Sequence, residues 1–256
     1  MYLSPRHEQI LELAKLEERV LVDELAARFD VTPQTIRKDL NDLCKQRLLT
    51  RIHGGAEFPS GVANFEYEDR RQIAALEKTA IGKAAAALIP NESSLFINIG
   101  TTTEAVSEAL LDHVGLMAIT NNINVANRLR LYPKFEVVMA GGVVRSTDGG
   151  IVGETAVDFI RQFKVDHAVI GTSAIDADGA LLDFDIREVK VAQAIIENAR
   201  NVILVADSTK FERTAPVRIA HISQVDTFVT DHCVSDDIRK VCEENDVRLI
   251  EVGSGS

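Results

Sequence analysis

The chain has 256 residues, of which 46% are hydrophobic and 26% charged, and its formal net charge is −11 at pH 7. This composition indicates one or two globular domains and excludes a disordered or fibrous chain. There is no apolar run near the roughly 20 residues of a membrane span, no secretory signal, and no ligand-like spacing among the three cysteines, so we expect a cytoplasmic protein without metal or other cofactor.

Residues 1–57 are predicted to form three helices and a β-hairpin, the pattern of a small winged helix-turn-helix domain. The helices are expected at residues 5–18, at 22–29 and from 33 on, and the hairpin at 48–57 around Gly54-Gly55. The third helix has the clearest start, because the Thr32 hydroxyl can cap it and Pro33 fits its first turn. One face of this helix is apolar and should be buried: Ile36, Leu40 and Leu43.

The outer face of the third helix carries amide and basic side chains: Gln34, Arg37, Lys38 and Asn41. In a DNA major groove, guanine is read best by Arg or Lys and adenine by Gln or Asn. Thr32 and Thr35 suit phosphate oxygens at the helix start, and Arg51 and His53 beside the hairpin turn are placed to reach the DNA backbone or minor groove. The alternative is a merely solvated helix face. The cap, the spacing and the hairpin together favour binding to double-stranded DNA.

Residues 58–76 are predicted to be a linker with a short aromatic and charged segment, and residues 77–252 a second domain. In the second domain, helices and short apolar strands alternate. Strands are expected at 94–99, 116–120, 136–140, 166–170, 201–206, 225–230 and 247–250, and helices at 77–89, 103–112, 123–130, 155–163, 187–199 and 235–245. This alternation predicts an α/β domain with a mostly parallel sheet covered on both faces. Residues 253–256 should be a tail outside the fold.

Several motifs of the first domain resemble the DeoR family of bacterial transcriptional regulators. They are Arg6-His7 with Ile10-Leu11, Val20–Leu25, Val31–Leu40 and His53–Ala56. The resemblance continues into the second domain and covers about residues 6 to 231. It implies a repressor that binds operator DNA through its N-terminal domain. Release would follow when the C-terminal sensor domain binds a phosphorylated sugar or polyol effector, such as glycerol 3-phosphate.

The most informative segment of the second domain is a predicted strand that ends in Gly100 and the hydroxyls of Thr101–Thr103. Free N–H groups, the helix dipole and hydroxyl donors converge there and favour an anion, although a simple helix cap is the alternative. Other polar loops also follow predicted strands, at 120–122, 141–145, 171–179 and 207–210. Ligands of open α/β sheets bind at the carboxyl ends of the strands, so we expect these loops to meet in one crevice.

These loops resemble those of the ribose-5-phosphate isomerase and CoA-transferase superfamily, whose fold the DeoR sensor domain shares. The resemblance implies a phosphate cradle of Gly100, Thr101, Thr102 and Lys210, and Lys210 suits a phosphate as a point charge. It also implies polar sugar-binding groups at Asp176, Asp178, Glu188 and Lys190, and the strand-end loops add Asn121 and Arg145 as candidates. For Asp176 and Asp178 the alternative is an Asx-type turn that ends at Gly179.

The expected function is that of a ligand-gated repressor and not of an enzyme. The alternative is a sugar-phosphate isomerase or acyl-transferase-like enzyme fused to a DNA-binding domain. Asp176 or Asp178 would then be the general base, with Lys190 or Lys210 as the electrophile. A glutamate nucleophile of the transferase kind has no clear motif, and a purely protein-binding module would have no use for the polar strand ends. Because helix-turn-helix proteins usually dimerise to read two half-sites, we expect a homodimer or homotetramer.

Overall fold

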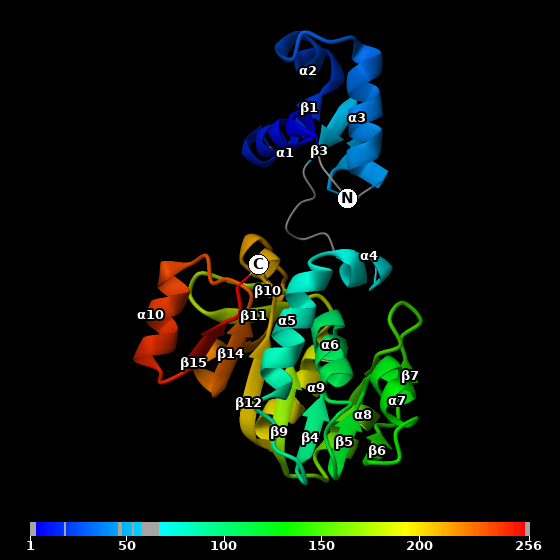
Figure 1. The fold of residues 1–256 in the computed structure, drawn as a ribbon, viewed down its shortest axis with the longest axis vertical. Helices are drawn as coiled ribbons and strands as arrows, with labels where there is room; N and C mark the ends of the chain where they lie inside the picture. The colour runs from blue at the N-terminus through cyan, green and yellow to red at the C-terminus, as the bar shows by residue number, and fades with distance from the viewer. Residues whose placement is uncertain (1–3, 18, 46–47, 53, 58–66, 254–256) are drawn as a thin grey trace. The chain divides into compact units, whose positions relative to one another are not determined.

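The computed structural model describes residues 4–17, 19–45, 48–52, 54–57 and 67–253 (Figure 1). The chain divides into two compact units, Met1–Ala63 and Asn64–Ser256, and the division falls inside the predicted linker. Of the predicted tail, only Gly253 belongs to the described residues. Each unit has its own hydrophobic core and is described by itself.

The first unit contains the three predicted helices and the hairpin. In chain order its elements are α1 (Pro5–Glu17), β1 (Arg19–Leu21), α2 (Val22–Arg28), α3 (Pro33–Lys45), β2 (Thr50–Ile52) and β3 (Gly55–Glu57). As predicted, Thr32 Oγ1 accepts a hydrogen bond from the Thr35 amide at 3.2 Å at the start of α3. The predicted apolar face of α3 is fully buried in the core of this unit. The fold of this unit is a winged helix-turn-helix.

Strand β1 was not predicted. It pairs with β3 in an antiparallel manner, with Val20 opposite Ala56, so that the strand order of this small sheet is β1-β3-β2. A strand of three residues is too short to show the alternation that marks a strand in a sequence. It exists because β3 supplies its hydrogen-bond partners from a distant part of the chain.

The second unit is built on a seven-stranded parallel sheet with strand order β15-β14-β12-β9-β4-β5-β6. The strands are β4 (Ser94–Ile97), β5 (Leu116–Thr120), β6 (Phe135–Met139), β9 (Val165–Ile170), β12 (Ala199–Val205), β14 (Thr227–Thr230) and β15 (Arg248–Glu251). Each corresponds to one of the predicted strands. The predicted α/β fold class is therefore confirmed.

Helices cover both faces of this sheet, and Figure 1 shows α5 and α6 in front of it. Their bounds are α5 (Ala75–Ala86), α6 (Thr101–Ala109), α7 (Ile123–Leu129), α8 (Glu154–Ile160), α9 (Ile186–Glu197) and α10 (Asp236–Glu244). Neighbouring side chains of β4 belong to different cores. Phe96 belongs to the core that contains residues of α8, α9 and α10, whereas Leu95 and Ile97 belong to the core that contains residues of α5, α6 and α7. This alternation places two cores on opposite faces of the sheet.

The second unit also contains several short elements that the sequence did not predict. They are α4 (Tyr67–Gln72), β7 (Val143–Val144), β8 (Ile151–Val152), β10 (Ala174–Ile175), β11 (Ala180–Asp183), the 3-10 helices η1 (Ser208–Glu212) and η2 (Ile222–Gln224), and β13 (Val217–His221). Strands β10, β11 and β13 form a separate antiparallel sheet. Helix α4 lies in the segment that the sequence assigns to the linker.

Replacing Leu40 with Ala should destabilise the first unit. Leu40 is fully buried in its core, and truncation of such a side chain removes buried surface and leaves a cavity, at a cost of about 2–5 kcal/mol. Denaturation followed by circular dichroism would measure this loss. The matched control is Asn41→Ala on the exposed side of the same helix, and an equal loss in the control would contradict the assigned packing.

Candidate functional site

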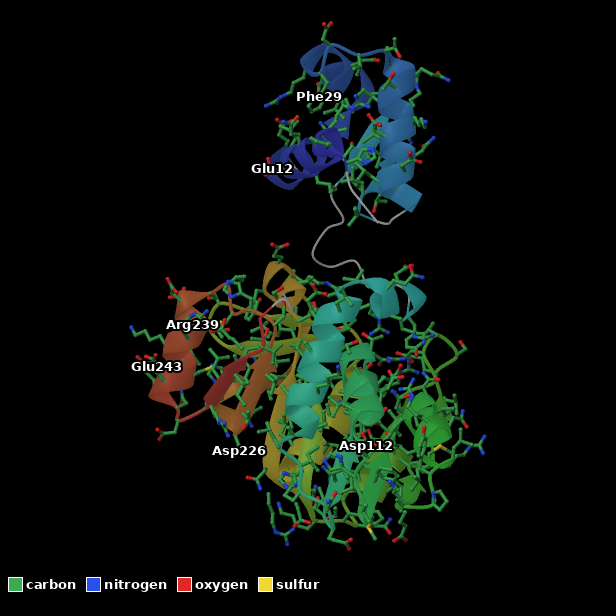
Figure 2. All side chains as sticks on the ribbon, viewed as in Figure 1. Glu12, Phe29, Asp112, Asp226, Arg239 and Glu243 are labelled. Carbon is green, nitrogen blue, oxygen red and sulfur yellow. The ribbon has the colours of Figure 1, made fainter. Side chains whose placement is uncertain are left out.

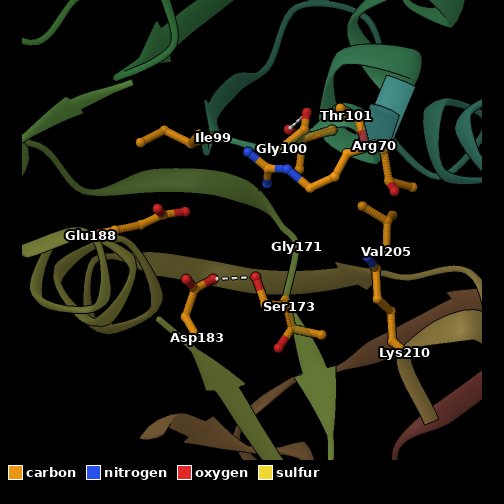
Figure 3. A pocket seen from close by; sticks show the side chains of 13 residues that line it. Arg70, Ile99, Gly100, Thr101, Gly171, Ser173, Asp183, Glu188, Val205 and Lys210 are labelled. Atoms are coloured by element: carbon orange, nitrogen blue, oxygen red, sulfur yellow. Dashed lines mark hydrogen bonds between the residues drawn. The ribbon is translucent and has the colours of Figure 1, made fainter. Parts of the chain in front are cut away.

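A pocket lies where β4, β9 and β12, which are neighbours in the sheet, reach their carboxyl ends (Figure 3). Its lining residues come from loops after these strands and from α4, β11, α6 and α9: Arg70, Ile99, Gly100, Thr101, Thr102, Thr103, Gly171, Thr172, Ser173, Asp183, Glu188, Val205 and Lys210. The strand-end loops were expected to meet in one crevice. The loops after β4, β9 and β12 do so in this pocket.

The first side of the pocket is the N-terminal end of α6. Gly100 has a backbone φ of +146°, a conformation that residues other than glycine rarely adopt. Thr103 Oγ1 donates to the carbonyl oxygens of Asn98 (2.7 Å) and Gly100 (2.8 Å), which fixes the turn. The first N–H groups of any α-helix have no acceptor within the helix. Those of α6 therefore form a donor set for an anion in the pocket.

The second side is a cluster of buried cations. Lys210 is 8% exposed, and burial lowers the pKa of its ammonium group to about 8, although the Asp207 carboxylate opposes the shift. Arg70, Lys78 and Arg213 also lower the pKa of Lys210, because like charges disfavour another proton. Lys210, Lys78 and Arg213 act on the buried Asp207, and Arg70 lies near Lys210. The cationic groups on this side of the pocket favour an anionic ligand.

The third side of the pocket is acidic. Glu188 is almost fully buried on α9, and burial together with the nearby Asp183 raises the pKa of its carboxyl group to about 7, although Arg145 opposes the shift. Asp183 accepts a hydrogen bond from Ser173 Oγ at 3.0 Å, which is drawn in Figure 3. At neutral pH these groups are able to accept hydrogen bonds from hydroxyls, and a protonated Glu188 can also donate one.

Arg145 positions this acidic side without lining the pocket. Its guanidinium lies 2.5 Å from Glu188 Oε2 and 3.3 Å from Asp185 Oδ2. It also donates two hydrogen bonds to Asp148, at 2.9 and 2.6 Å. Asp185 caps α9 by accepting a bond from the Arg187 amide at 2.9 Å, and the Arg187 side chain lowers the pKa of Asp185 to about 2. Arg145 thus ties the β7–β8 loop to the start of α9.

The pocket brings together half of the predicted effector-binding residues: Gly100, Thr101, Thr102, Glu188 and Lys210. Asp176 and Asp178 lie elsewhere, exposed in the β10–β11 turn, where Asp178 Oδ1 accepts from the Ala180 amide at 2.9 Å. This is the geometry of the alternative, an Asx-type turn. Lys190 is also exposed and lies 2.6 Å from Glu154.

The remaining candidate, Asn121, is fully buried, and its side chain donates to the Ile151 carbonyl at 3.1 Å instead of lining the pocket. The pocket is also lined by Arg70, Ser173 and Asp183, which were not among the predicted site residues. Ser173 could have been found from the sequence, because it lies in the polar loop that directly follows the strand predicted at 166–170. Asp183 ends a strand that was not predicted, and Arg70 belongs to the presumed linker.

The predicted DNA-reading side chains lie along one side of α3, where Figure 2 shows side chains projecting outward. Gln34, Arg37 and Lys38 are exposed. They share a shallow groove with Ser4, Arg6, His7, Thr32, Thr35, Asp39, Asn41 and Asp42. Asp39 is buried and pairs with Arg6 at 2.6 Å, so its negative charge is compensated beside this face.

Arg51 is exposed on β2, and His53 lies outside the described residues. Within the part of the chain that the structure describes, no group of three or more His, Cys, Asp and Glu side chains is suited to a metal ion. No described helix has the length and apolar character needed to cross a membrane.

A winged helix-turn-helix unit joined to an α/β unit with a polar pocket is the architecture of a DNA-binding transcriptional regulator. The chain belongs to the DeoR family of these regulators. Residues 6–62 match the DeoR-like helix-turn-helix domain, and residues 73–232 match the DeoR C terminal sensor domain. The family predicted from the sequence motifs is confirmed.

Relatives within this family align over nearly the whole chain. The glycerol-3-phosphate regulon repressor of Escherichia coli K12 is 47% identical over 249 residues, which cover 97% of this chain and 99% of the relative. The protein of the same name from Haemophilus influenzae is 48% identical and covers 98% and 97%. The HTH-type transcriptional repressor CsqR of E. coli K12 is 41% identical and covers 96% and 95%. The protein is thus a DNA-binding transcriptional repressor.

Solved structures with a similar fold are more distant. Ribose 5-phosphate isomerase A from Neisseria gonorrhoeae is 14% identical with a TM-score of 0.38, and the match covers 52% of each chain. The eIF2B beta protein of Chaetomium thermophilum is 15% identical with a TM-score of 0.44, covering 62% of this chain and 50% of that one. Neither likeness bears on function.

Binding of a phosphate monoester in the pocket should weaken as the pH rises from about 7 to above 8, because Glu188 becomes a carboxylate near pH 7 and Lys210 loses its proton near pH 8. A phosphate monoester, whose second pKa is about 6, is a dianion throughout this range. Calorimetric titration with glycerol 3-phosphate at increasing pH would show the fall in affinity. Lys210→Arg should flatten the profile, since a guanidinium stays charged. An equally steep fall in that variant would show that another group titrates.

Proposed function

We propose that this repressor is released from its operator by a phosphorylated polyol, glycerol 3-phosphate, bound in the pocket of the second unit. The observation that carries the proposal is the division of the pocket into a cationic and N–H-rich part and an acidic part. The names of the relatives from E. coli and H. influenzae, which refer to glycerol 3-phosphate, support the same effector.

The phosphate group would bind the N-terminal end of α6 at Gly100, Thr101 and Thr102 together with Lys210. A dianion there would offset the desolvation of the buried ammonium group and accept bonds from otherwise unpaired amides. The polyol hydroxyls would face Ser173, Asp183 and Glu188, whose oxygens accept hydrogen bonds. Arg145 would act indirectly, by holding Glu188 in place.

Operator DNA would be bound by the α3 face of the first unit. We propose that Gln34, Arg37 and Lys38 contact base edges and that the hydroxyls of Thr32 and Thr35 contact phosphate. Arg51 and His53 would reach the backbone or the minor groove from the wing. Two copies of this unit are needed to read two half-sites, which supports a homodimer or homotetramer.

We further propose that the pocket senses its ligand without converting it. Asp176 and Asp178, the candidate bases of an isomerase, are turn residues outside the pocket, and Lys190 is paired with Glu154. Glu188, with its pKa near neutrality, is the lining group that an enzyme could use as a base. Incubation with glycerol 3-phosphate and with ribose 5-phosphate, followed by product analysis, tests this point, and any turnover abolished in Glu188→Gln would contradict it.

Replacing Arg37 with Ala should weaken operator binding by about 1–3 kcal/mol and relax discrimination at one operator position, if Arg37 contacts a base edge. Arg51→Ala should instead weaken operator and random DNA about equally, because a phosphate contact carries no sequence information. Fluorescence anisotropy with both DNAs at several salt concentrations measures the two effects. Unchanged specificity in Arg37→Ala would remove this residue from the reading face.

Replacing Lys210 with Ala should give a repressor that still binds its operator but is not released by glycerol 3-phosphate, because the phosphate loses its buried counter-charge. Thr101→Val should weaken release in the same way. Lys190→Ala is the matched control, since Lys190 is an exposed lysine outside the pocket. Normal release in the Lys210 and Thr101 variants would exclude this cradle.

A further inference from the structure

Helix α4 belongs to the pocket but lies outside both matched family domains. It spans Tyr67–Gln72, whereas the matches end at residue 62 and resume at residue 73. It is the first described element of the second unit, and in the chain it follows β3 of the DNA-binding unit after residues 58–66. Its Arg70 nevertheless lines the pocket. One short helix thus connects the ligand site to the chain that leads to the DNA-binding unit.

The Arg70 guanidinium has hydrogen-bonding capacity left for a ligand. Its Nη2 donates to Asp148 Oδ2 at 3.2 Å, whereas its buried Nε has no hydrogen-bond partner among the described residues. Figure 3 shows the guanidinium pointing into the pocket. A buried N–H donor without an acceptor is costly, so an incoming phosphate oxygen would be favoured at this atom.

Asp148, the present partner of Arg70, has other hydrogen bonds that remain if Arg70 turns away from it. Asp148 is buried, but it accepts two bonds from Arg145, at 2.9 and 2.6 Å, and one from the Gly150 amide at 3.1 Å. If Arg70 turned from Asp148 to a phosphate, the Asp148 carboxylate would keep these three bonds. The exchange therefore leaves no unpaired buried carboxylate behind.

Arg70 also occupies part of the narrow space that a ligand would enter. The cavity measures about 30 Å³, and Arg70 is one of its lining residues. A phosphate that enters this space therefore comes close to the Arg70 guanidinium, which is carried by α4.

Helix α4 is also held by Tyr67, which lies on the same face of the helix as Arg70. The Tyr67 hydroxyl donates to Glu104 Oε2 at 2.7 Å and accepts from Asn124 Nδ2 at 2.9 Å. Glu104 is buried on α6, the helix whose N-terminal end lies at the pocket, and it also accepts from Asn122 at 3.0 Å. Tyr67 thus connects α4 to the first turns of α6 and to α7.

We propose that Arg70 is an effector phosphate ligand and that α4 is the element through which the effector acts on the DNA-binding unit. A bound phosphate draws the Arg70 guanidinium away from Asp148. Arg70 and Tyr67 lie on the same face of α4, so this displacement acts on the hydrogen bonds of Tyr67 to Glu104 and Asn124. These bonds lie at the end of α4 where the connection to the first unit begins. This inference rests on the proposed effector function.

The first test concerns Arg70 as a ligand. Arg70→Gln should weaken glycerol 3-phosphate binding at least tenfold in calorimetric titration of the full-length protein. Arg130→Gln is the matched control, because it removes an exposed arginine of the same unit that bonds to Asn127 and not to the pocket. Thermal melting shows whether each variant is folded, and Arg70→Lys provides a second variant that keeps the charge. Unchanged affinity in folded Arg70→Gln overturns the assignment.

The second test concerns α4 as the connecting element. Tyr67→Phe keeps the ring but removes the bonds to Glu104 and Asn124, so we expect normal operator affinity without effector and normal effector affinity. The effector-induced fall in operator affinity, measured by anisotropy, should shrink at least fivefold. Tyr132→Phe is the matched control, since Tyr132 packs against Phe135. In hydrogen exchange, glycerol 3-phosphate should change the exchange of residues 67–72 in the wild type.

The outcomes separate the two proposals. If the wild type binds no glycerol 3-phosphate, the proposed function fails and this inference fails with it. If the wild type binds the ligand and is released from the operator, but Tyr67→Phe is released equally well and the exchange of α4 does not change, the inference about α4 alone is overturned. A merely structural role for Tyr67 would lower the melting temperature without changing the coupling between effector and operator.

Discussion

The burial of positive charge at the carboxyl edge of the sheet is the constraint on which the second unit depends. Lys78 and Lys210 are almost fully buried beside Asp207, and Arg70 and Arg213 add to the same field. Burial alone would raise the pKa of Asp207, but the ammonium groups of Lys210 and Lys78 lower it. The charge is tolerated because backbone carbonyls also take part: Lys78 Nζ donates to the carbonyl oxygens of Arg70 and Ile73. The same bonds tie α4 and the α4–α5 connection to α5.

The parallel topology of the sheet brings other polar segments to the edge where these cations are buried. Strands β12, β9 and β4 are adjacent, so the segments that follow them reach the same edge even though they are far apart in the chain. Continuous apolar runs such as Leu95–Ile97 predicted these strands, and Gly100–Thr102 and Lys210 follow two of them directly. The fold class and these pocket-lining residues were therefore accessible from the sequence, since both depend on local pattern and on one general rule of sheet geometry.

The rest of the pocket depends on tertiary contacts that leave no local pattern. Asp183 lies at the end of β11, whose pairing with β10 and β13 was not predicted, and this pairing turns the Asp176–Asp178 segment out to solvent. Lys190 is two residues from Glu188 on α9, so the two side chains leave the helix in different directions. Arg70 lies among charged residues that are typical of a linker, and only the packing of α4 against α6 makes it part of the site.

The position of α4 also has a consequence for recombination between members of this family. A crossover between two repressors at the start of the matched sensor domain, residue 73, would join the pocket of one parent to the α4 of the other. The hybrid would inherit an Arg70 and a Tyr67 that had not been selected together with its Asp148 and Glu104. A crossover before Tyr67 keeps these partners together. The contacts of the pocket therefore extend beyond the sensor domain as sequence comparison defines it.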